Sequence, residues 1–133
     1  MNDQEKSAIF PVGEKFESEW FNKTVWLHPL IPAGAALPVY NVTFEPGCRN
    51  NWHKHQGGQV LLVTTGRGYY QEWGKPAREL RPGDTVDIPA DVKHWHGAAR
   101  DSWFSHVAIE VAPEKGPAIW LEPVGDEDYD GLR

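Results

Sequence analysis

The stretch that decides the fold is WHKHQGGQ, residues 52–59. His53 and His55 are two positions apart, and Gln59 follows four positions after the second histidine. Residues two apart on a strand project from the same face, so both imidazoles can converge on one ion. Gln59 can fold back beside them at the start of the next strand. The stretch therefore indicates a candidate metal site, although one His-x-His pair alone is common on strands that bind nothing.

The histidines continue beyond this stretch. His94 and His96 form a second His-x-His pair, and His106 lies on a later segment. Of the 6 histidines, all but His28 lie between positions 53 and 106. A group of imidazoles of this kind suits Mn, Fe, Ni, Cu or Zn.

The segments around the histidines have the pattern of a β protein. Short apolar or alternating runs are separated by turns rich in glycine and proline, of which the chain has 13 and 11. This pattern favours a sandwich or small barrel. We expect strands at 24–27, 39–45, 59–65, 69–73, 77–81, 85–89 and 101–111, with Pro29 ending the first. We also expect a short strand at 118–122 and, in the acidic tail 125–133, a helical turn or a frayed end.

Composition excludes several classes of protein. The chain has 133 residues and a net charge of −6 without a basic cluster, which argues against nucleic-acid binding. No run approaches the roughly 18 apolar residues of a membrane span. The start of the chain does not resemble a signal peptide. Cys48 is the single cysteine and we expect it to be passive and packed. We expect one cytoplasmic domain over residues 1–133, with residues 1–20 as an N-terminal arm.

The spacing of the glycines, histidines and a proline resembles the two motifs of the cupin family. The matching residues are Gly47, His53, His55, Gln59 and Gly66 in the first motif, and Gly83, Pro89 and His94 in the second. The resemblance implies an all-β fold, a small double-stranded β-helix or jelly-roll barrel, with an ion inside one end. Gln59 stands where cupins usually have glutamate. A neutral amide leaves the charge of the ion uncompensated, so the ion would be a stronger Lewis acid.

The sequence also resembles one particular group within the cupin family. WHKHQGGQ, GRGYYQEWG, RPGD and KHWHGAA look like the small manganese cupins that act as (R)-selective hydroxynitrile lyases, which cleave cyanohydrins to an aldehyde and cyanide. The likeness implies one divalent metal per subunit, Mn(II) first and Fe(II), Ni(II) or Zn(II) as alternatives. It implies the metal ligands His53, His55, Gln59 and His94.

The same resemblance suggests the catalytic residues. His106 would take the hydroxyl proton as general base, and His96 would help to hold the departing cyanide. The alternative for each is a buried histidine that only satisfies its neighbours.

Seven residues are candidates for the substrate pocket: Tyr40, Val42, Phe44, Asn50, Trp52, Tyr69 and Glu110. The aromatic members are equally consistent with core packing. Tyr40 and Glu110 depart from the lyases, in which the corresponding residues are small and neutral, so they would shrink the cavity and change its charge. Glu110 either faces this cavity, as a second acid/base or an extra metal partner, or, if the strand register is shifted by one, is a solvated surface charge.

Other functions fit the same residues. An Fe(II) dioxygenase would use three imidazoles, one oxygen ligand and open positions for substrate and O2. A non-catalytic module would use the ion only for stability, and an isomerase or decarboxylase would act on a small acid. The resemblance also implies a homodimer or homotetramer. Ile9, Phe10, Trp20 and Phe21 add apolar residues to the arm that need a surface to cover them.

Overall fold

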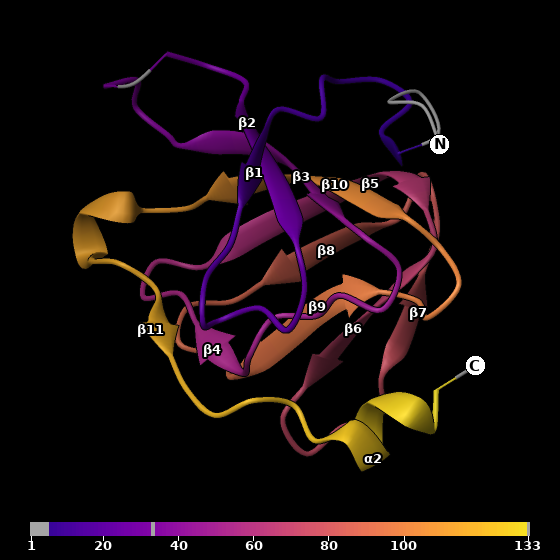
Figure 1. Ribbon diagram of the computed structural model, residues 1–133. Coiled ribbons are helices and arrows are strands. Elements are labelled where there is room, and N and C mark those ends of the chain that lie inside the picture. The colour runs from indigo at the N-terminus through magenta and orange to yellow at the C-terminus, as the bar shows by residue number, and fades with distance from the viewer. Residues whose placement is uncertain (1–5, 33, 133) are drawn as a thin grey trace.

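Two antiparallel sheets face each other in a computed structural model that describes residues 6–32 and 34–132 (Figure 1). The six-stranded sheet has the order β1 (Glu14–Phe16), β2 (Val25–Pro29), β3 (Val39–Phe44), β10 (Phe104–Glu110), β5 (Gln59–Gly66) and β8 (Thr85–Ile88). The five-stranded sheet has the order β11 (Ile119–Trp120), β4 (His53–Lys54), β9 (His94–Ala98), β6 (Gly68–Glu72) and β7 (Arg78–Leu80). The expected all-β barrel is confirmed.

Most strands overlap the predicted ranges, and β4 is an additional strand of two residues. Three other differences follow. Pro29 is the last residue of β2, where it pairs with Tyr40, and does not lie beyond the strand. The segment around His94 is a strand, β9. Residues 14–16 of the expected arm form β1, which pairs with β2, whereas residues 1–5 of the arm lie outside the described residues. A 3-10 turn (Pro113–Lys115) and a short helix, α2 (Asp126–Asp130), complete the elements.

The main core lies between the two sheets. On β10 the side chains of Phe104, His106 and Ala108 alternate inward, and all three are buried. Across the sheet His106 is paired with Val42 of β3 and Val63 of β5. The strand alternation therefore places one imidazole among hydrocarbon side chains inside the barrel.

A second hydrophobic cluster covers the outer face of the five-stranded sheet. It contains Trp52, Tyr69, Trp95, Val124 and Tyr129. In Figure 1 the C-terminal segment with α2 runs below this sheet, on the side away from the barrel interior. The hydroxyl of Tyr129 donates a 2.6 Å hydrogen bond to the carbonyl of β9 residue 98, which fastens the C-terminal segment to the strand that carries His94. No helix in the described part of the chain is long and apolar enough to cross a membrane.

Candidate metal centre

Three histidines from two neighbouring strands meet inside the barrel. His53 on β4 is paired with His94 on β9, and His96 follows two residues later on the same face. One nitrogen from each of the three rings lies within 4.8 Å of the others. All three rings are buried. The arrangement brings enough imidazole nitrogens together for one divalent ion.

Backbone carbonyls fix the tautomers of His53 and His94. Nδ1 of His53 donates to the carbonyl of Asn51 at 2.8 Å, and Nδ1 of His94 donates to the carbonyl of Val92 at 2.9 Å. Each bond leaves Nε2 as the atom with the lone pair, and Nε2 of His94 is buried without a hydrogen-bond partner. Burial lowers the pKa of His94 to about 4 and that of His53 well below its usual value. Both rings are therefore neutral near pH 7, which is the form that binds metals.

His55 and Gln59 add two further donor atoms beside these rings. The ring centre of His55 lies 5.0 Å from that of His53 and 5.6 Å from that of His94. Nε2 of His55 and Oε1 of Gln59 are buried and have no hydrogen-bond partner. Buried lone pairs without partners are costly in an apolar interior. An ion bound by them would remove that cost, so these residues fit a divalent transition metal.

The glycines of WHKHQGGQ allow the loop between His55 and Gln59 to pack tightly. A Cβ on Gly57 would lie 2.0 Å from the carbonyl oxygen of Val111. Gly58 has a φ of +94°, in the left-handed region that favours glycine. The two glycines therefore let the loop return Gln59 to the start of β5, beside His55.

Glu110 contacts two of the expected ligands. β10 and β5 pair Glu110 directly with Gln59. Oε2 of Glu110 accepts a 2.5 Å hydrogen bond from Nε2 of Gln59, and Oε1 lies 2.8 Å from Nδ1 of His55. Of the two positions considered for this side chain, the structure places it against the histidine site and not as an isolated surface charge.

Asn50, His96 and His106 form a chain of hydrogen bonds. Oδ1 of Asn50 accepts the backbone N–H of His96 at 3.0 Å, so the Asn50 amide nitrogen faces Nε2 of His96 at 3.3 Å. Because an amide nitrogen only donates, Nε2 of His96 accepts and the hydrogen of this neutral ring sits on Nδ1. That hydrogen points to Nε2 of His106, 3.3 Å away.

The hydrogen bonds of this chain distinguish His96 and His106 from the histidines that are free to bind an ion. Both lone-pair nitrogens in the chain are engaged: Nε2 of His96 by Asn50, and Nε2 of His106 by His96. His96 thus differs from His53 and His94, in which a backbone carbonyl holds Nδ1 and no side chain of the described residues holds Nε2. His106 keeps its hydrogen on Nδ1, which is buried without a hydrogen-bond partner. Burial lowers its pKa to about 3, so the ring is neutral near pH 7.

A cavity of about 350 Å³ reaches the site from the side of His55 and Glu110. Gly57, Gly58 and Val111 also line it. Of the proposed ligands, His55 lines this cavity.

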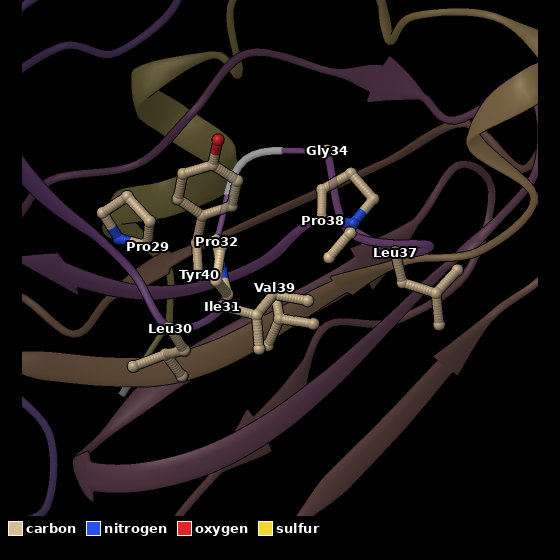
Figure 2. Close-up of a pocket in the computed structure, with 10 residues that line it drawn as sticks. Pro29, Leu30, Ile31, Pro32, Gly34, Leu37, Pro38, Val39 and Tyr40 are labelled. Atoms are coloured by element: carbon tan, nitrogen blue, oxygen red, sulfur yellow. The ribbon is translucent and has the colours of Figure 1, made fainter.

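Tyr40 lines a second, apolar cavity of about 610 Å³ formed by residues 29–32, 34–35 and 37–40 (Figure 2). Pro38 borders both cavities, so the two are neighbours. Val42 and Phe44 of the same strand are buried beside His106, and the rings of Phe44 and His106 are 5.5 Å apart. Of these three candidates, only Tyr40 is exposed.

Trp52 and Tyr69 do not line the histidine site, which corrects the expectation for both. They belong to the cluster on the outer face of the five-stranded sheet. Strand alternation is the reason: Tyr69 is paired with Gly97 and follows the outward face, whereas Tyr70 is paired with His96 and faces inward. The ring of Tyr70 lies 5.7 Å from that of His94. The same period-two pattern, anchored on His94, contained the signal that identifies Tyr70.

Sequence reasoning also missed Trp120. This residue on β11 is paired with His53, and the two rings stack at 4.5 Å with an interplanar angle of 28°. Trp20 stacks in turn on Trp120 at 5.6 Å, and Phe21 packs against Phe44. Two of the apolar residues of the expected arm are therefore covered within their own chain.

Comparisons with known proteins agree with this geometry. A family model described as cupin domain matches residues 40–108. The chain is 42% identical over 117 residues, 86% of this chain and 89% of the other, to an (R)-mandelonitrile lyase of Granulicella tundricola. It is 48% identical to a cupin-like protein of Thermotoga maritima of known structure, with a TM-score of 0.88 over 92% of this chain and 95% of that one. A DMSP lyase from Ruegeria pomeroyi shares the fold at 22% identity, with a TM-score of 0.65 over 77% of this chain and 54% of its own.

Proposed function

The chain belongs to the cupin family, and on that premise we propose that it is a metal-dependent lyase that cleaves a cyanohydrin to an aldehyde and cyanide, or a close relative of such lyases that acts on another small molecule. The observation that carries the proposal is the set of buried lone pairs on His55, Gln59 and His94 that have no hydrogen-bond partner. They lie in a chain 42% identical to an (R)-mandelonitrile lyase.

The proposed ligands are His53, His55, Gln59 and His94, and they would hold one divalent transition metal per chain. Mn(II) is the metal that the resemblance favours, and Fe(II), Ni(II) and Zn(II) suit the same atoms. When bound, such an ion supplies Lewis acidity, which lowers the pKa of a substrate hydroxyl near it.

His106 is the proposed general base, and the hydrogen-bond chain defines what this role requires. The hydrogen on its Nδ1 has to shift to Nε2 before Nδ1 can accept the hydroxyl proton. Nδ1 of His96 then has to accept from Nε2 of His106, so His96 also changes tautomer. Its hydrogen moves to Nε2 and faces the amide N–H of Asn50 at the end of the hydrogen-bond chain. Such a mismatch costs about 1–3 kcal/mol, which is small compared with ordinary catalytic barriers. With its hydrogen on Nε2 after the change of tautomer, His96 would donate that hydrogen to the nitrile nitrogen.

Glu110 favours a neutral substrate. Its carboxylate lines the cavity that reaches His55, so an incoming carboxylate would meet a like charge at short range. A neutral cyanohydrin meets no such repulsion. Among the functions considered, this feature supports the lyase over an isomerase or decarboxylase acting on an acid.

The test is a cleavage assay with racemic mandelonitrile on protein loaded with Mn(II). We expect release of benzaldehyde without consumption of oxygen, and loss of both the activity and the metal in His53→Ala. Bound metal with oxygen uptake and no cleavage would support the dioxygenase instead. Bound metal that raises thermal stability but supports neither reaction would support the non-catalytic module.

We further propose that the protein is a cytoplasmic homodimer or homotetramer. Ile9 and the β1 residue Phe16 have relative exposures of 66% and 42%, and β1 lies at the edge of its sheet. A partner subunit would cover these apolar side chains. Light scattering that gives the mass of one chain would contradict the assembly.

A further inference from the structure

We propose that Glu110 is a positioning residue for the metal centre: it orients the Gln59 amide and the His55 ring and supplies the negative charge that the ligands lack. This inference rests on the proposed function, because it assumes that His53, His55, Gln59 and His94 bind the ion. It assigns Glu110 neither to the ligands nor to the acid–base step.

The first contact fixes the amide of Gln59. An amide group can be turned by half a rotation with little change in shape, so its environment decides which end faces the ion. Oε2 of Glu110 lies 2.5 Å from Nε2 of Gln59, and a carboxylate oxygen can only accept from it. Nε2 is therefore held toward Glu110, and Oε1 remains as the buried atom without a partner. That atom is the one able to bind a cation.

The second contact acts on His55. Oε1 of Glu110 lies 2.8 Å from Nδ1 of this ring, a close contact between charge and ring nitrogen that does not have hydrogen-bond geometry. A carboxylate at this distance favours hydrogen on Nδ1 and leaves the lone pair on Nε2, as in the carboxylate–histidine pairs that flank many metal ions. Backbone carbonyls do the same for His53 and His94. One side chain, Glu110, therefore orients the two ligands of the loop that no backbone carbonyl holds.

The charge argument is independent of orientation. Three imidazoles and an amide are neutral ligands, so an ion of charge +2 in a buried site needs a nearby anion. Glu110 is paired in register with Gln59 on the adjacent strand, so its carboxylate contacts the side chains of two proposed ligands, Gln59 and His55. With 29% of its side chain exposed, the carboxylate also keeps part of its hydration, which lowers the cost of holding it there.

Glu110→Gln tests both parts with little change in volume. The new amide can still accept from Gln59 through its oxygen. Its nitrogen then faces Nδ1 of His55 and favours hydrogen on Nε2 of that ring. An ion that binds Nε2 has to drive this hydrogen back to Nδ1 against the new amide, which lowers the affinity but keeps the same ligands. The matched control is Glu122→Gln, which removes the same charge from an exposed pair with Lys93 on the outside of the barrel. Glu110→Asp keeps the charge with a shorter reach, and it carries the test if Glu110→Gln does not fold.

The measurement is the Kd of Mn(II) for metal-free protein by calorimetry, together with the visible spectrum of each variant saturated with Co(II). We expect Glu110→Gln to bind Mn(II) about 10–100-fold more weakly, Glu110→Asp to be intermediate, and Glu122→Gln to stay within about twofold of the parent. The Co(II) spectrum should keep its band positions, because the ligands are unchanged.

Each other outcome overturns the inference. Equal affinity in Glu110→Gln and the parent would show that the carboxylate does not position the ligands. A changed Co(II) spectrum would make Glu110 a ligand itself. An equal loss of Mn(II) affinity in Glu122→Gln would show that the change in net charge alone explains the effect. A parent protein that binds no metal would remove the proposed function as well, which distinguishes that failure from the other three.

Discussion

Replacing Asn50 by alanine should destabilise the metal-free protein more than any other single amide-to-alanine change at the site's edge. Asn50 is buried, and its side chain pairs with both the backbone N–H and Nε2 of His96. Truncation leaves these two buried polar atoms without partners. At about 1–3 kcal/mol for a buried unsatisfied group, with the backbone N–H as the larger part, we expect a loss of about 2–4 kcal/mol.

The assay is urea unfolding followed by tryptophan fluorescence, with metal removed and at one fixed protein concentration, because assembly also contributes to stability. The control is Asn51→Ala, whose side chain makes a single 3.0 Å bond to the carbonyl of Leu121 and should lose about 1 kcal/mol. A loss for Asn50→Ala no larger than that of the control would refute the account of the Asn50–His96–His106 chain.

Three further predictions follow from the site. His106→Ala should abolish turnover and leave the metal content unchanged; retained turnover would remove His106 from the mechanism. Burial lowers the pKa of His94 to about 4 and of His106 to about 3, against about 6.5 in an unfolded chain. The unfolded state therefore binds more protons over this range, and urea titrations should show metal-free protein losing stability as pH falls from about 6.5 toward 3; a flat profile would contradict the burial. Gly57→Ala places a Cβ 2.0 Å from a backbone oxygen and should lower both Tm and Mn(II) affinity, whereas the open position Gly74 should tolerate alanine in space although its φ is +83°.

The sequence predicts the barrel and the grouping of its ligands because both depend on local patterns. Strand alternation and turn residues define most strands, and the spacing of His53, His55 and Gln59 is short enough for geometry to bring them together. The placement of Glu110 opposite Gln59 needs the register between β5 and β10, which a shift of one residue would reverse. The sequence therefore offered two positions for this side chain, and only the pairing of the strands distinguishes them.

The remaining features depend on contacts between distant parts of the chain. Trp120 stacks on His53 because β11 pairs with β4. The two residues are 67 positions apart, and no periodic pattern in the sequence connects them. The Asn50–His96 bond likewise joins a loop to β9. Aromatic character predicts Tyr69 and Trp52 in the cavity, but the outer face of the five-stranded sheet near α2 is an equally apolar environment. Residue type alone does not separate these two faces.

The measurement that tests the central claim most directly is metal analysis of the protein after dialysis against Mn(II), beside His53→Ala treated in the same way. We predict about one metal ion per chain in the parent and almost none in the variant, because His53 is one of the four proposed ligands and its ring lies 4.2 Å, centre to centre, from that of His94. A parent protein without metal, or a variant that retains a full equivalent, would contradict the assignment of this histidine cluster as a metal centre.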